Sequence, residues 1–97
     1  MPLKFKNEEA QVIIQACEGH LFDGIKPNCL TKLAKCLTLS GKEFRDLVRY
    51  LKNVAMTGIQ KSSVGSGLNY RKYLLCAYNA MRALDICNSV KMAAQEN

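Results

Sequence analysis

Four cations recur at helical spacing near the middle of this 97-residue chain. At 100° per residue, their side chains share a sector of about 80° on one helix, opposite its apolar residues. Members four and seven residues apart are separated by about 6 and 10 Å along the axis, so that several side chains can meet successive phosphates of one nucleic-acid strand. The four residues are Lys42, Arg45, Arg49 and Lys52.

Three more cations follow in the same part of the chain. Residues 40–72 hold seven Lys and Arg against two Asp and Glu, so they carry +5 of the formal net charge of +6. Lys61, Arg71 and Lys72 flank a Ser/Gly-rich segment, residues 61–67, which we expect to form a flexible turn. If this turn folds back beside the helix, the three cations extend the surface that contacts phosphates.

Two tyrosines, Tyr70 and Tyr73, lie within this cationic region and are candidates for stacking on a base. RNA is slightly favoured over DNA, because no helix carries a pattern of Asn, Gln and Arg aimed at base edges. These observations predict a small, non-enzymatic module that binds the phosphate backbone of nucleic acid.

Other partners are compatible with the same charge pattern. An ordinary amphipathic helix also keeps Lys and Arg on its solvated face, and an acidic protein or a lipid surface also attracts cations. The main alternative is therefore a helical protein-interaction module, an adaptor or regulator, that binds an acidic partner.

The residues that could support catalysis do not form a convincing set. Cys17 and His20 have the types of a thiolate–imidazole pair, but Gly19 places a helix stop between them and no oxyanion donor is identifiable. Lys61 precedes the glycines of the Ser/Gly segment, whereas a P-loop requires Lys after its second Gly and a strand before the loop. We therefore predict no enzyme, no catalytic residue and no cofactor.

The cysteines argue against a metal site and indicate a reducing compartment. There are five, irregularly spaced, with no CxxC and one histidine in the whole chain, so the paired ligands of a zinc site are missing. Each occupies a position where a helix would place a small apolar residue, which predicts buried thiols in the cytoplasm or nucleus. No apolar stretch approaches 18 residues, so we expect no membrane span. The five are Cys17, Cys29, Cys36, Cys76 and Cys87.

Helical signals dominate the chain, and its length allows one domain over residues 1–97. Ser40-Gly-Lys-Glu43 is a capping box that begins the cationic helix, and we expect Gly58 to end it. We expect Asn69 to cap a long last helix and residues 1–6 and 95–97 to be flexible. The predicted fold is all-α, a compact bundle of four to five helices around that long C-terminal helix.

The last helix is apolar almost all the way round. Such a helix is either central to its fold or shared with a second chain. Leu75, Asn79, Arg82 and Ile86 follow one another at spacings of 4, 3 and 4, which is typical of a coiled-coil seam. These four residues are the predicted interface of a homodimer.

Overall fold

The computed structural model describes residues 2–18, 27–64 and 68–96. The all-α prediction is confirmed for these residues, which form four helices and one short two-stranded antiparallel sheet. The elements in chain order are β1 (Leu3–Lys4), α1 (Asn7–Glu18), α2 (Cys29–Cys36), β2 (Thr38–Leu39), α3 (Gly41–Val64) and α4 (Leu68–Glu96).

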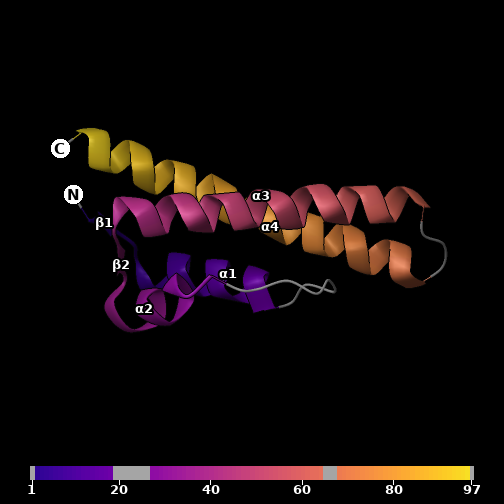
Figure 1. The fold of residues 1–97 in the computed structure, drawn as a ribbon, viewed down its shortest axis with the longest axis horizontal. Coiled ribbons are helices and arrows are strands. Elements are labelled where there is room, and N and C mark those ends of the chain that lie inside the picture. The colour runs from indigo at the N-terminus through magenta and orange to yellow at the C-terminus, as the bar shows by residue number, and fades with distance from the viewer. Residues whose placement is uncertain (1, 19–26, 65–67, 97) are drawn as a thin grey trace.

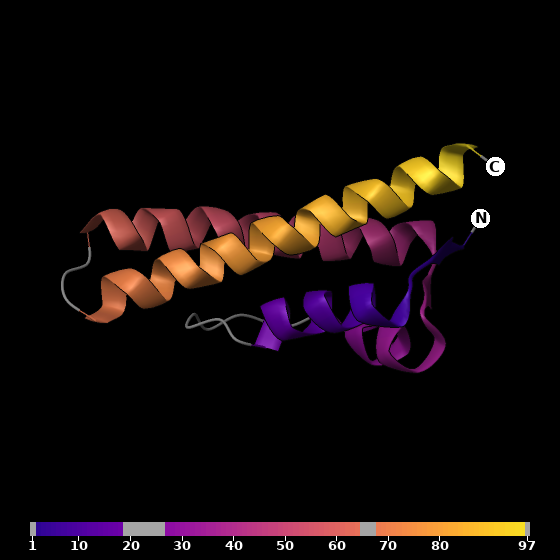
Figure 2. The same ribbon diagram turned by 180° about the vertical axis from the view of Figure 1, so that it is seen from behind.

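Helices α3 and α4 form a long antiparallel hairpin, and α1 and α2 lie along one side of it (Figures 1 and 2). The most extensive contact in the molecule joins α3 to α4, and α1 packs mainly on α4. The largest fully buried side chains come from all four helices and from β2. They are Ile13, Cys17, Leu33, Leu39, Leu47, Leu51 and Cys87.

The small sheet ties the beginning of the chain to the beginning of α3. Leu3 pairs with Leu39, and the Phe5 amide donates a hydrogen bond of 2.8 Å to the Leu37 carbonyl. Leu37 itself has a φ of 57°, which turns the chain out of α2 and into β2. We expected residues 1–6 to be flexible, whereas in the structure Leu3 and Phe5 are buried in the core.

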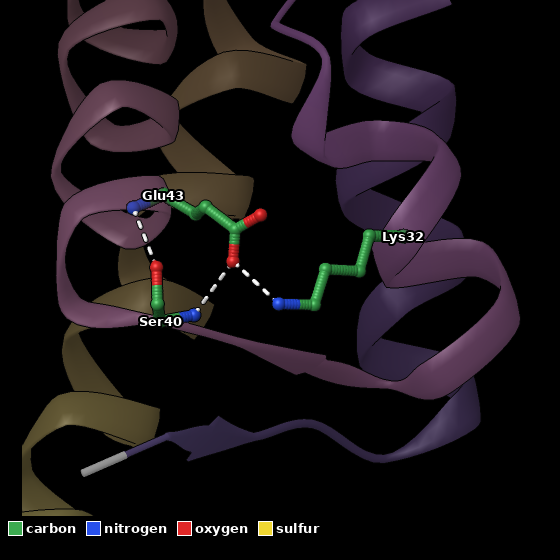
Figure 3. Close-up of polar contacts among 3 residues, drawn as sticks. All are labelled: Lys32, Ser40 and Glu43. Atoms are coloured by element: carbon green, nitrogen blue, oxygen red, sulfur yellow. Dashed lines mark hydrogen bonds and ion pairs between the residues drawn. The ribbon is translucent and has the colours of Figure 1, made fainter.

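The predicted capping box at the start of α3 is confirmed, and Figure 3 shows a third member. The Ser40 amide donates to Glu43 Oε1 at 2.8 Å, and the Glu43 amide donates to Ser40 Oγ at 3.2 Å. Lys32 from α2 adds an ion pair, with its Nζ 2.8 Å from the same Glu43 oxygen. The pKa of Glu43 is therefore lowered to about 2, mainly by its hydrogen bond with Lys32 and next by the Ser40 amide.

The prediction that Gly58 ends the cationic helix is wrong, because α3 continues to Val64. Gly58 is buried where α4 passes closely over it. A Cβ atom at this position would lie 2.8 Å from the Tyr73 carbonyl oxygen and 3.0 Å from the Ala77 Cβ. The glycine is thus explained by helix–helix packing and not by a helix stop.

The helices of the hairpin are longer than expected at the turn as well. Residues 61–64 of the expected Ser/Gly turn are helical, and residues 65–67 lie outside the described residues. Because α4 begins at Leu68, Asn69 lies inside the helix and does not precede it as a cap.

Candidate functional site

The four cations of the sequence motif lie together on α3, and we call them the cationic stripe: Lys42, Arg45, Arg49 and Lys52. All four side chains are exposed, while Phe44, Leu47 and Leu51 of the same helix are buried. Among the residues that the structure describes, no ion pair involves a member of the stripe. The stripe therefore presents its charge to solvent.

A shallow groove between α3 and α4 runs beside the stripe. Its α3 side includes Arg45, Val48 and Lys52, and its α4 side includes Asp85 and Lys91. The floor is partly apolar, because buried Phe44 and half-buried Leu84 also line the groove. An anion that lies in the groove would meet cations from both helices.

Lys91 is the member of this site that sequence reasoning missed. It lies far from the stripe in the sequence, and the antiparallel pairing of α3 and α4 brings it to the groove. No local signal in the sequence marks it, since its position depends on the register of two helices. Asp85, an exposed acid on the same groove, partly offsets its charge.

Lys61 does not join the cationic stripe. It follows Lys52 by nine residues of continuous helix, which places it half a turn round α3 and about 14 Å further along the axis. Its Nζ lies 5.6 Å from the centre of the Tyr73 ring, a cation–π contact. Tyr73 is half-buried and its ring already contacts Lys61, so less of the ring is accessible for stacking on a base than we expected.

The remaining predicted site residues lie at the far end of the hairpin. Arg71 and Lys72 are exposed in the first turns of α4, about 30 Å along that helix from Lys91. Tyr70 is also exposed there. The structure thus separates the predicted site into a group beside the groove and a group near the hairpin turn.

The predicted dimer seam is exposed in part. Leu75 is 59% exposed and Arg82 is also exposed, whereas Asn79 is half-buried. Ile86 packs against the hydrophobic core of its own chain, so it is less available to a second chain than the sequence suggested.

Acidic side chains are missing from a long part of the hairpin. Between Asp46 and Asp85 the sequence contains six Lys and Arg and no Asp or Glu. Every formally charged side chain that α3 and α4 carry between these two residues is therefore positive. Anionic partners are the ones that such a surface attracts.

Two of the buried thiols are held in their neutral form. Burial raises the pKa of Cys87 to about 12, and burial together with Glu43 raises the pKa of Cys29. The candidate base His20 lies outside the described residues. Within residues 2–18, 27–64 and 68–96, no three His, Cys, Asp or Glu gather in a way that could hold a metal ion. The same residues include no helix that is both long and apolar enough to cross a membrane.

This chain was compared with protein-family models, curated proteins and solved structures. No family model, no curated protein and no solved structure matches this chain.

Proposed function

We propose that this protein is a small, non-enzymatic module that binds the phosphate backbone of nucleic acid, with RNA slightly favoured over DNA. The observation that carries the proposal is the cationic stripe, four exposed cations in a row on one helix with Lys91 across the groove. Each such cation that neutralises a phosphate releases a counterion and so contributes to affinity.

The geometry of the stripe supports contacts with successive phosphates. Arg45, Arg49 and Lys52 are held on one continuous helix, so their spacing of about 6 and 10 Å is fixed before binding. Arg45 and Arg49 provide planar guanidinium groups that bind phosphate oxygens in pairs. Lys42 extends the row towards the start of the helix.

Salt dependence tests this function directly. If about five cations contact phosphates of a duplex, the logarithm of the affinity should fall with the logarithm of the salt concentration at a slope near −4 to −5. Fluorescence anisotropy with labelled duplex RNA, duplex DNA and single strands at several salt concentrations measures that slope. Absence of binding at about 50 mM salt would exclude the function.

Two charge-matched variants identify the surface. Arg45→Ala/Arg49→Ala should lower the magnitude of the salt slope by about 2 without unfolding the protein, because both side chains are exposed. Lys4→Ala/Lys35→Ala removes the same charge from exposed positions that do not line the groove and should change the slope much less. Equal losses in the two variants would mean that binding depends on net charge and not on the cationic stripe.

We also propose that the protein functions as a homodimer through Leu75 on the outer side of α4. The exposure of this leucine supports the proposal. Leu75→Glu should convert the dimer to a monomer in sedimentation equilibrium without loss of helicity by circular dichroism. The single substitution suits this test because Ile86 packs on the core of its own chain. A monomeric wild-type protein would remove the proposal.

The proposed location is a reducing compartment, the cytoplasm or nucleus. All five cysteines lie in the described part of the chain and none of them is in a disulfide. Four of the five are buried and serve as small apolar side chains in the helix contacts. The prediction of a buried thiol is wrong for Cys36, which is exposed at the end of α2.

A further inference from the structure

The cationic stripe continues along α3 as an apolar one. Met56 and Ile59 follow Lys52 at spacings of four and three residues, which keeps them on the same side of the helix. Met56 is 59% exposed and also lines the groove beside Lys52. The surface therefore changes from charged to apolar along one face of α3.

A matching apolar row lies on α4. Leu74, Tyr78 and Met81 repeat at spacings of four and three residues and lead on to Asp85, which lines the groove beside Lys52. All three apolar side chains are exposed. Lys52 lines the groove together with Met56 and also with Asp85, so the two rows that lead to these residues flank the same side of the antiparallel hairpin (Figure 1), nearer to its turn.

We call these five side chains the distal surface: Met56, Ile59, Leu74, Tyr78 and Met81. They are five of the eight large apolar side chains that are exposed in the described residues. Single exposed apolar residues are normal, but a group on one face marks an interaction site. The two methionines suit such a site, since their unbranched side chains adapt to the shape of a partner.

Cations border the distal surface and no acid does so until Asp85. Lys52 lies at its α3 end, and Arg71 and Arg82 lie on α4 three and four residues from members of the apolar row. A partner that covers the surface must therefore be apolar at its centre and anionic at its edges.

We propose that the distal surface docks an acidic amphipathic helix from a partner protein. The inference goes beyond nucleic-acid binding, since the five apolar side chains of the distal surface are not part of the cationic stripe, although Lys52 borders both surfaces. From Leu74 to Asp85 the surface is about 17 Å long, which corresponds to about three turns of a helix. A helix with apolar residues at i, i+4 and i+7 and with carboxylates beside them would place its apolar row between α3 and α4 and its acids near Lys52, Arg71 and Arg82.

Charge complementarity favours this partner over two others. A second copy that docked through the distal surface itself, and not through Leu75, would place Lys52, Arg71 and Arg82 against the same three cations of the other copy. Nucleic acid would satisfy the cations, but its sugar–phosphate backbone offers little apolar surface to cover Met56, Ile59 and Met81. An acidic amphipathic helix satisfies both the apolar centre and the cationic border.

A designed peptide tests the proposal. The probe is a fluorescein-labelled peptide of about 16 residues with Leu at i, i+4, i+7 and i+11 and Glu at most other positions, made in both sequence directions. Two control peptides have the same composition in scrambled order and the same pattern with Lys in place of Glu. In fluorescence anisotropy, at least one direction of the Glu peptide should bind saturably, and both controls should bind at least about tenfold more weakly.

Matched methionine variants locate the binding. Met56→Ser/Met81→Ser should weaken binding of the Glu peptide about tenfold or more, because the loss of two apolar contacts exceeds the free energy of a tenfold change. Met92→Ser removes a methionine that is exposed elsewhere on α4 and should leave the affinity unchanged. Circular dichroism melts check that the three substituted positions, all exposed, leave the fold intact.

Several results would overturn the proposal. They are absence of binding by the Glu peptide in either direction, equal binding of the scrambled peptide, and unchanged affinity of Met56→Ser/Met81→Ser. Loss of dimerisation in that variant would assign the distal surface to a second copy. Loss of RNA binding, or of sedimentation with phosphatidylserine vesicles, without any peptide binding would assign it to nucleic acid or membrane.

The outcome is separable from the proposed function. Arg45→Ala/Arg49→Ala should reduce RNA binding and leave most of the peptide affinity, and Met56→Ser/Met81→Ser should do the reverse. If the protein binds the peptide but not RNA, only the proposed function is wrong. If it binds RNA but not the peptide, only the proposal for the distal surface is wrong.

Discussion

Substitution of Gly58 by alanine tests the packing that forms the hairpin. The added Cβ would lie 2.8 Å from the Tyr73 carbonyl oxygen, 3.0 Å from the Ala77 Cβ and 3.2 Å from the Ala77 amide nitrogen. Two of these atoms belong to the backbone of α4 and cannot rotate away. Helix α4 must therefore move by about 0.6 Å before the closest of these distances reaches the 3.4 Å of ordinary contact.

Two opposing effects determine the magnitude. Replacement of glycine by alanine inside a helix is intrinsically favourable by about 1 kcal/mol. Overpacking in a buried contact costs about 1–3 kcal/mol, and we expect the upper part of this range because the displacement extends along the largest helix contact of the molecule. The net loss in the free energy of unfolding is then about 2 kcal/mol, which lowers the Tm by about 8–16 °C.

The assay is urea unfolding and thermal melting followed by circular dichroism at 222 nm, with Gly41→Ala as the control. Gly41 lies at the start of α3 with no atom within 4 Å of the added Cβ, so its substitution should leave stability unchanged or raise it by up to about 1 kcal/mol. If Gly58→Ala is as stable as Gly41→Ala, then α4 does not approach α3 as closely at Gly58 as described above, and the reasoning is refuted.

Two further predictions concern ionisation. The pKa of Glu43 is about 2 in the folded protein against 4.5 without its partners, so the carboxylate stabilises the fold fully above about pH 4.5, and this stabilisation is lost as the pH falls through 2. The difference in free energy of unfolding between wild type and Glu43→Gln should shrink over that range, and a difference independent of pH would contradict the Lys32 and Ser40 contacts. In iodoacetamide labelling at pH 8, exposed Cys36 should react first, and Cys87, with a pKa of about 12, should react only on unfolding. Mass spectrometry of the labelled peptides distinguishes this order from simultaneous labelling.

Local signals in the sequence predicted the features that depend on one helix at a time. The phase of the cationic helix follows from its apolar period, and the structure places Phe44, Leu47 and Leu51 in the core as that period requires. The capping box from Ser40 to Glu43 is equally local, because both of its hydrogen bonds join residues three apart.

The features that sequence reasoning missed depend on contacts between distant segments. A glycine at position 58 could end the helix or could allow a neighbouring helix to approach closely, and the surrounding sequence is the same in both cases. Only the position of α4 shows that the second role applies. The pairing of Leu3 with Leu39 joins two strands of two residues each, which are too short to show a pattern. The position of Lys91 beside the groove depends on the hairpin register for the same reason.

The small sheet has a mechanical consequence for the binding helix. Leu39 pairs with Leu3 and immediately precedes Ser40, whose hydroxyl accepts the hydrogen bond that begins α3. Backbone hydrogen bonds of the short sheet therefore join the first residues of the chain to the start of α3. A force applied to the N-terminal segment would act on Ser40 through this pairing before it acted on α1. A fusion or tether at that end would therefore strain the first turn of α3, the helix that carries the cationic stripe.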